Sequence, residues 1–247
     1  MESPIKAAKT FVAELTDIDR SKHASEIFRD FCEMAYCAIA KRSCPDADRR
    51  DALEAQYAAV ESRYKKSVTD PMGNLMGQAA IALKNGGCDF LGLVAGEIGM
   101  LDARMGQFFT PYDVSRMMAE ITLGDADKLI AEKGFITVSE PAAGAAGMVI
   151  AMADCLADRG HDLSSCVWVE AVELSRSTAH MAYVQMSLRG VPGRVLHGNS
   201  LSLEVWSSDL TPAGCSFLMN LAKQKQAARE PVPRKAIPRP KSPKVPA

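Results

Sequence analysis

The feature that most constrains the fold is a bend of small residues between an apolar stretch and a helix-favouring segment. Residues 139–147 read Ser-Glu-Pro-Ala-Ala-Gly-Ala-Ala-Gly. The apolar stretch Phe135–Val138 precedes this bend, and the helix-favouring apolar segment Met148–Leu156 follows it. A strand, a turn rich in glycine and alanine, and a helix form the element that lays a ligand across a helix N-terminus. We therefore expect a ligand site here, and a plain strand-to-helix corner is the alternative.

Strands and helices alternate further along the chain. The pattern predicts a strand over Phe135–Val138, a helix over Gly147–Arg159, a strand over Cys166–Glu173, a helix over Ser175–Arg189 and a strand over Arg194–His197. This βαβαβ order predicts an α/β fold with a parallel sheet and right-handed crossovers.

In the first hundred residues the pattern of apolar positions predicts helices only. Apolar positions recur at helical spacing over residues 5–37, with breaks or caps between Asp17 and Ser25. Further helices are expected over 46–65, 75–83 and 89–100, with a turn at Pro71-Met72-Gly73. We expect a helical domain at 1–104, an α/β domain at 105–222 and a tail at 223–247.

The net charge of −1 hides an asymmetry. From Lys223 to the end there are eight Lys or Arg and one acid, Glu230, so the tail carries about +7 and the rest about −8. Because the tail is also rich in proline, Ala227–Ala247 are expected to be disordered. The tail is either a solvated extension or an arm that binds phosphates without sequence preference.

Cysteine usage indicates a cytoplasmic protein. The seven cysteines form no CxxC pair and have no metal-ligand spacing with the four histidines, so we expect reduced thiols and no metal site. No apolar run reaches the ~18 residues of a membrane span, and no membrane contact is expected.

Three acids lie near the strand ends, and two of them are candidate ligand contacts. Glu140, at the end of the first strand, is costly to bury unless it is paired or binds something. Glu170 and Glu173 lie at the end of the second strand, where an acid can accept hydrogen bonds from ribose hydroxyls. We favour Glu173 for this role and expect Glu170 to pair with an arginine or a loop amide.

Two further segments complete the candidate site. Asn199, in His-Gly-Asn-Ser-Leu after the third strand, offers a donor and an acceptor to an adenine edge, or simply belongs to a turn. Phe108 and Phe109 either pack in the core or cover a ligand. Thr110 is expected to cap the helix Tyr112–Leu123, with Pro111 at its first position.

Together these segments resemble the N6-adenine DNA methylases. GQFFTPYDVSRMMAEI, SEPAAGAAGMVIAMA, VEAVELSRSTAHMAYVQMSLRGV and HGNSL occur in order within residues 89–201. The likeness is closest to the modification subunit of type I restriction systems and to small relatives on mobile elements. It implies a Rossmann-like methyltransferase fold, S-adenosylmethionine as cofactor and DNA as partner.

The resemblance also implies roles for single residues. By motif, it places Phe108, Thr110 and Pro111 near the methionine end of the cofactor, Glu140, Ala142, Gly144 and Ala146 in the cofactor loop, Glu173 at the ribose and Asn199 beside the adenine. Ala146 stands where the family has glycine, and its methyl group is expected to crowd the cofactor. Asn199 stands where the family usually has aspartate, and Glu140 where aspartate is common.

One family motif is missing. These enzymes carry [DNS]PP[YFW], which holds the amine of a flipped adenine, and this chain contains no Pro-Pro. The nearest positional candidate for a catalytic residue is Asn220, within Phe217–Ala222, where an apolar strand-like run ends in this asparagine. The resemblance therefore leaves three hypotheses open: a methyltransferase that acts alone or is completed by a partner subunit, a non-catalytic regulatory or decoy relative, and a remnant that binds no cofactor.

Overall fold

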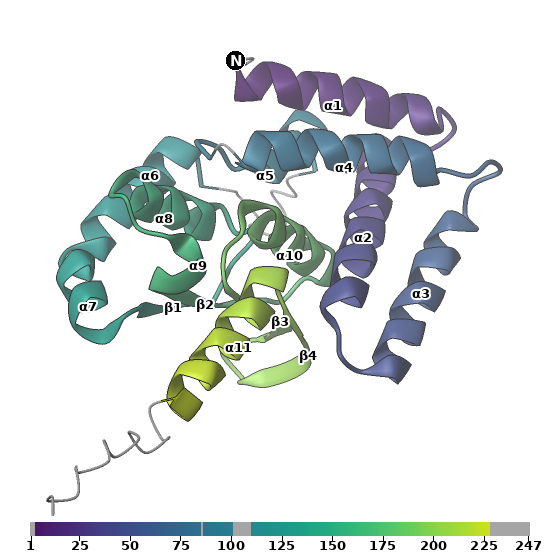
Figure 1. Cartoon of the computed structure of the whole chain (residues 1–247). Helices are drawn as coiled ribbons and strands as arrows, with labels where there is room; N and C mark the ends of the chain where they lie inside the picture. Colours follow the sequence, from purple (N-terminus) through teal and green to yellow (C-terminus); the bar gives the residue numbers. More distant parts are fainter. Residues whose placement is uncertain (1–2, 85, 101–109, 228–247) are drawn as a thin grey trace, which may run out of the picture.

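The computed structural model describes residues 3–84, 86–100 and 110–227 of the 247-residue chain. Helices dominate the first part of the chain, and strands begin after residue 135 (Figure 1). The helices are α1 (Pro4–Ile18), α2 (Ala24–Ser43), α3 (Ala47–Glu61), α4 (Thr69–Lys84), α5 (Phe90–Glu97), α6 (Tyr112–Leu123), α7 (Ala126–Lys133), α8 (Gly147–Asp158), α9 (Leu163–Cys166), α10 (Arg176–Arg189) and α11 (Pro212–Ala227). The predicted class, α/β behind a helical N-terminal region, is confirmed.

The sheet contains the predicted βαβαβ unit and one additional strand. β1 (Ile136–Glu140), β2 (Val167–Glu173) and β3 (Gly193–Asn199) are parallel and adjacent in that order. β4 (Glu204–Leu210) pairs antiparallel with β3, so the sheet is mixed and not purely parallel. β4 was not predicted because most of its side chains are exposed, which leaves no alternation of apolar and polar residues.

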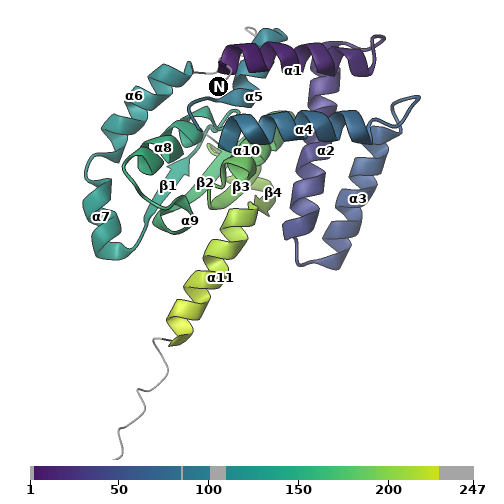
Figure 2. The ribbon, with the colours of Figure 1, turned by 45° about the horizontal axis from the view of Figure 1, so that its top comes forward.

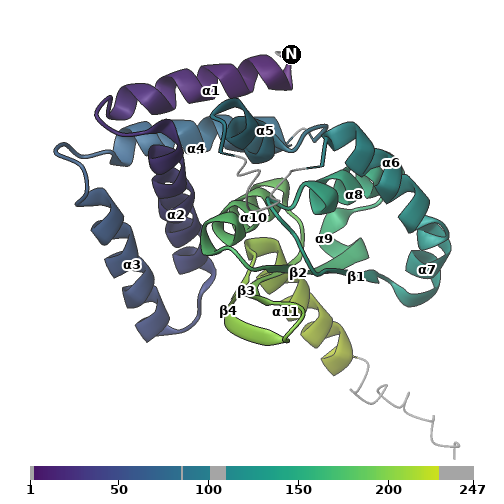
Figure 3. The same cartoon turned by 180° about the vertical axis from the view of Figure 1, so that it is seen from behind.

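Helices cover both faces of the sheet (Figure 3). In β2, Val167, Val169 and Ala171 are fully buried on one face, and the side chains between them are only partly buried. Right-handed crossovers place α8 and α10 together on one face of a parallel sheet. On the other face, Phe217 of α11 packs against Trp168, with ring centroids 5.6 Å apart.

The N-terminal helices pack on the outer side of α10 (Figure 2). α2 and α4 contact α10, which is consequently buried between the sheet and the helical region. A single hydrophobic cluster runs through both parts of the molecule. At its N-terminal end Phe11 makes edge contacts with Phe28, Phe31 and Phe90 at centroid distances of 6.4, 5.2 and 5.6 Å.

Polar contacts fix the far edge of the sheet to the helical region. Asp209 of β4 accepts a hydrogen bond from the Tyr36 hydroxyl at 2.7 Å and forms an ion pair with Arg49 at 3.2 Å. These contacts join β4 to α2 and α3, which are more than 150 residues away in the sequence.

Two local predictions are wrong. Pro71-Met72-Gly73 lies inside α4 and forms no turn, because a proline in the first turn of a helix removes no hydrogen bond. Phe217–Ala222 belong to α11 and not to a strand, and α11 continues past the boundary expected at residue 222. Thr211 begins this helix by accepting a hydrogen bond from Gly214 N at 3.0 Å.

Candidate functional site

The sequence-predicted acids end neighbouring strands. Glu140 is the last residue of β1 and Glu173 the last residue of β2, while Asn199 ends β3. Because these three strands are parallel, their carboxyl ends lie along one edge of the sheet. Ligands of open α/β sheets bind at this edge.

Glu173 directly contacts the small-residue bend. Its Oε2 accepts a hydrogen bond from Gly144 N at 2.9 Å, and its Oε1 accepts one from Ser175 N at 2.8 Å. The side chain is only 9% exposed. Each carboxylate oxygen retains a further lone pair after these contacts, so Glu173 can accept two more hydrogen bonds from a diol at the bend.

The bend has the backbone conformation that a close ligand contact needs. Gly144 has φ of 55° and Ala146 has φ of 70°, so two residues of the bend are in the left-handed region. Ala146 is the N-cap of α8, and the first amides of that helix have no acceptor within the helix. The bend thus presents N–H groups and the positive end of a helix dipole to the edge of the sheet.

The side chain of Ala146 points into the protein. Its methyl group is fully buried and does not line an open surface at the bend. The consequence of alanine at this position is therefore backbone strain, since residues with a Cβ seldom adopt positive φ. The crowding expected from the sequence has no support in this geometry.

Glu140 and Ala142 form the start of the bend. Glu140 Oε1 accepts a hydrogen bond from Ala142 N at 3.1 Å, and Ala142 is exposed. Glu170, by contrast, forms an ion pair with Arg194 of β3, which is the structural role that we expected for it.

Asn199 closes its own turn. Its Oδ1 accepts hydrogen bonds from Leu201 N at 2.9 Å and from Ser202 N at 3.3 Å. These contacts match the turn interpretation, and neither of them joins Asn199 to Gly144 or Glu173. The role beside an adenine stays a prediction.

The predicted segment near the methionine end of the cofactor is only partly described. Phe108 lies outside the described residues, whereas Thr110 and Pro111 are both exposed. Pro111 is the N-cap of α6, and no side chain caps this helix, so the predicted cap by Thr110 is wrong by one residue. Their contact with a cofactor stays a prediction.

Asn220 lies on the exposed side of α11. Phe217, one turn earlier, contacts Phe135 and Trp168 at the amino ends of β1 and β2, with centroid distances of 5.1 and 5.6 Å. Glu140 and Glu173 lie at the other ends of these strands, the carboxyl ends. The strand that made Asn220 a catalytic candidate does not exist, and the structure gives no other reason to retain it.

A buried amide supports the bend from behind, and sequence reasoning missed it. Gln185 of α10, fully buried, donates from Nε2 to Ala145 O and to Asp89 Oδ1, both at 2.6 Å. Its Oε1 accepts from Leu91 N at 3.0 Å. A Cβ at Gly147 would lie 2.6 Å from Asp89 Oδ2, so glycine is needed there. Burial raises the pKa of the Asp89 carboxyl.

A second buried acid fixes the start of α6. Asp154 of α8 accepts hydrogen bonds from the Tyr112 hydroxyl, from Gly87 N at 2.7 Å and from Arg189 Nε at 2.6 Å. Tyr112 directly follows Pro111, so Asp154 holds the segment that the sequence assigns to the cofactor. Nothing local in the sequence marks Asp89, Gln185 or Asp154 as partners.

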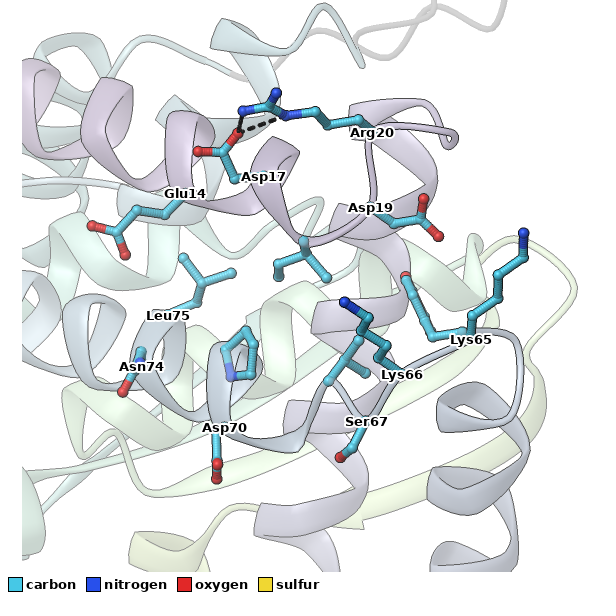
Figure 4. Close-up of a pocket in the computed structure, with 14 residues that line it drawn as sticks. Glu14, Asp17, Asp19, Arg20, Lys65, Lys66, Ser67, Asp70, Asn74 and Leu75 are labelled. Atoms are coloured by element: carbon cyan, nitrogen blue, oxygen red, sulfur yellow. Dashed lines mark hydrogen bonds and ion pairs between the residues drawn. The ribbon is translucent and has the colours of Figure 1, made fainter.

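A separate cavity of about 700 Å³ lies between the end of α1 and the start of α4 (Figure 4). Its lining carries both charge signs, for example Asp19, Lys66 and Asp70, and Arg20 pairs with Asp17 at its rim. All its lining residues fall within positions 14–75, so this cavity is not part of the strand-end site.

Two other classes of site have no support in the described part of the chain. Residues 3–84, 86–100 and 110–227 hold no cluster of three or more His, Cys, Asp or Glu with the geometry of a metal site. Every helix in these ranges falls short of the length and apolarity that a membrane crossing requires.

Comparison with known proteins identifies the α/β part. Residues 99–216 match the model of the N-6 DNA methylase family, which confirms the resemblance for this region. No curated protein sequence matches the chain. Enzymes of this family transfer a methyl group from S-adenosylmethionine to DNA, and S-adenosylmethionine is thus the cofactor implied for this region.

One solved structure is similar. It is described as a putative class I S-adenosylmethionine-dependent methyltransferase from Listeria monocytogenes, with 15% identity, 80% of this chain covered and a TM-score of 0.40. The match spans 53% of that protein, about half its length. A TM-score this low supports no inference about function.

Proposed function

We propose that this chain binds S-adenosylmethionine at the carboxyl ends of β1 and β2 and works as a DNA-associated methyltransferase-like protein of the cytoplasm. The observation that carries the proposal is the contact between Glu173 and Gly144. It brings the ribose acid and the cofactor bend, 29 residues apart, to hydrogen-bond distance with acceptor capacity to spare. Glu140, Ala142, Ala146, Thr110, Pro111, Phe108 and Asn199 complete the proposed site.

Methyl transfer requires a partner subunit in this proposal. Adenine N6 is a poor nucleophile, so catalysis depends on acceptors that hold the amine in line with the methyl donor. The sequence contains no Pro-Pro motif, and Asn220 is exposed on α11, which packs at the amino ends of β1 and β2. The finer likeness to a type I modification subunit implies that the chain works in a restriction-modification assembly, in which other subunits are present.

The same observations favour a second candidate function. A chain that binds the cofactor and lacks amine acceptors can serve as a catalytically inactive regulatory or decoy protein of a mobile element, associated with DNA. The two candidates share the cofactor site and differ only in whether a second chain completes the catalysis.

Calorimetry with S-adenosylmethionine tests the cofactor site. Glu173→Gln replaces the carboxylate by an amide that accepts fewer hydrogen bonds, and we expect it to weaken binding at least about tenfold. Glu170→Gln is the matched control, since Glu170 lies on the same strand and pairs with Arg194. No binding heat from the wild type, or equal losses in both variants, would remove the site.

Transfer of a tritiated methyl group to unmethylated DNA separates the two candidates. The isolated chain is expected to bind the cofactor without incorporating label. Incorporation by the isolated chain would contradict the need for a partner, whereas incorporation only after addition of a neighbouring chain with an NPPF-type motif would favour the first candidate.

A further inference from the structure

β1 forms an edge of the sheet, and no described strand pairs with its outer side. Val169 of β2 donates its N–H to a backbone oxygen beside β3 at 2.9 Å. The N–H and C=O groups of successive residues point alternately to the two sides of a strand, so those of Trp168 and Glu170 point towards β1. In the register of the two strands Val138 lies opposite Val169, between these two residues. The backbone of Val138 therefore faces β2, and the N–H and C=O groups of Thr137 and Ser139 face outward.

An apolar groove runs along this open edge. It has a volume of about 420 Å³ and lies between β1, α6, α7 and α8. Leu123, Leu129, Val149 and Met152 contribute its apolar lining. The ribbon shows α6, α7 and α8 grouped beside β1, at the opposite end of the sheet from β4 (Figure 3). Main-chain groups beside an apolar groove are the combination that binds an extended peptide strand.

Helix α6, which forms one wall of the groove, carries a second exposed apolar surface. Val114, Met117, Met118 and Ile121 follow the i, i+3, i+4, i+7 spacing of a helix face, and their exposures are 40, 58, 44 and 73%. Such a stripe normally faces a core. A protein that added a strand to β1 could cover it at the same time.

The charge around the groove indicates which occupant fits. Residues 112–140 contain six acids and three basic residues, a net charge of −3. A second copy of this chain, paired edge to edge through β1, would place one acidic surface against another. A strand from a different protein, flanked by lysine or arginine, is electrostatically complementary.

We propose that the outer edge of β1 and its groove bind an extended apolar segment, flanked by basic residues, of a separate polypeptide. A parallel strand here would end beside Glu140, so the residues after it would lie next to Gly144 and Glu173. That these residues supply the missing amine acceptors rests on the function proposed above; the docking itself does not.

The test uses a fluorescein-labelled peptide of alternating valine and threonine with two lysines at each end. Because strand addition reads main-chain groups, a generic strand is a sufficient probe. Fluorescence anisotropy with the full chain is expected to show saturable binding.

Ser139→Pro removes one outward N–H and leaves the pairing with β2 intact, and we expect about tenfold weaker binding. Ser139→Ala keeps the N–H and is expected to bind like the wild type.

Leu129→Asn, in the groove wall, is a second variant that is expected to weaken peptide binding. It replaces Ser139→Pro if that substitution lowers the melting temperature too far. No saturable binding by the wild type, or equal binding by Ser139→Pro and Ser139→Ala, would overturn the proposal. A wild-type dimer in sedimentation that Ser139→Pro dissociates would assign the edge to a second copy instead. Equal binding of a glutamate-flanked peptide would refute the basic flanks. Peptide binding needs no cofactor, so its failure and a failure of the calorimetry are separate results.

Discussion

Ala146 shows how one residue balances opposing energies at the bend. An L-residue in the left-handed region costs about 1–2 kcal/mol. Glycine would relieve that cost, but it would lose about 0.8 kcal/mol of methyl burial and about 0.5–1 kcal/mol of backbone entropy. We therefore expect Ala146→Gly to change the free energy of unfolding by less than about 1 kcal/mol. Because the methyl group does not line the open surface of the bend, cofactor affinity is expected to stay the same.

Urea denaturation and calorimetry check this, with Ala145→Gly as the control. Ala145 is equally buried but has no positive φ to relieve, so its substitution should cost about 1–2 kcal/mol. Equal losses in the two variants would contradict the strain argument.

His180 makes stability depend on pH. It is 7% exposed and stacks on Tyr36 with centroids 4.3 Å apart. Burial, and then the charges of Arg176 and His197, lower the pKa of His180 to about 3. In the unfolded chain His180 binds a proton near pH 6.5, whereas in the folded chain it stays neutral at that pH. The contribution of neutral His180 to the free energy of unfolding is therefore present above pH 6.5 and is lost as pH falls towards 3.

For one such group the loss between pH 6.5 and 5 is about 2 kcal/mol. His180→Phe keeps an aromatic ring against Tyr36 and has no proton to bind. Urea titrations at several pH values should therefore show a shallower decline for this variant, and parallel curves would rule out His180 as the source.

At the scale of elements, Asp154 joins α8 to α6, α10 and the loop before α5. Removing this buried acceptor in Asp154→Ala leaves Arg189 without its partner, which should cost about 3–5 kcal/mol. Glu120→Ala breaks an exposed ion pair between Glu120 of α6 and Arg159 at the end of α8, and is expected to cost much less. Unfolding followed by circular dichroism compares the two, and similar losses would show that Asp154 acts as an ordinary surface charge.

Sequence patterns predicted the elements whose hydrophobic period is clear. The unit from β1 to β3 was predictable, and the meeting of Gly144 and Glu173 followed from it, because parallel strands end at one edge. β4 was not predictable, since Trp206 and its neighbours are exposed and lack alternation. The apolar run around Phe217 suits a strand or a helix equally, and only Thr211-Pro212 at its start decides for the helix. Gln185 and Asp89 are 96 residues apart, and only the packing of α10 brings them together.

At the scale of the whole molecule, the charge distribution makes a prediction about DNA. Residues 228–247 contain six Lys or Arg and one acid, so they carry +5 while residues 1–227 carry −6. If this segment contacts phosphates, its deletion should weaken DNA binding equally for different sequences and should reduce the slope of log affinity against log salt by up to about 5. Fluorescence titrations at several salt concentrations measure this slope, and an unchanged slope would remove the tail from DNA binding.

α10 is buried on both sides, by the sheet on one and by α2 and α4 on the other. The methylase-like half cannot be excised from the first hundred residues without stripping a whole helix of its covering. The methylase-like half therefore depends on the N-terminal helices for its stability.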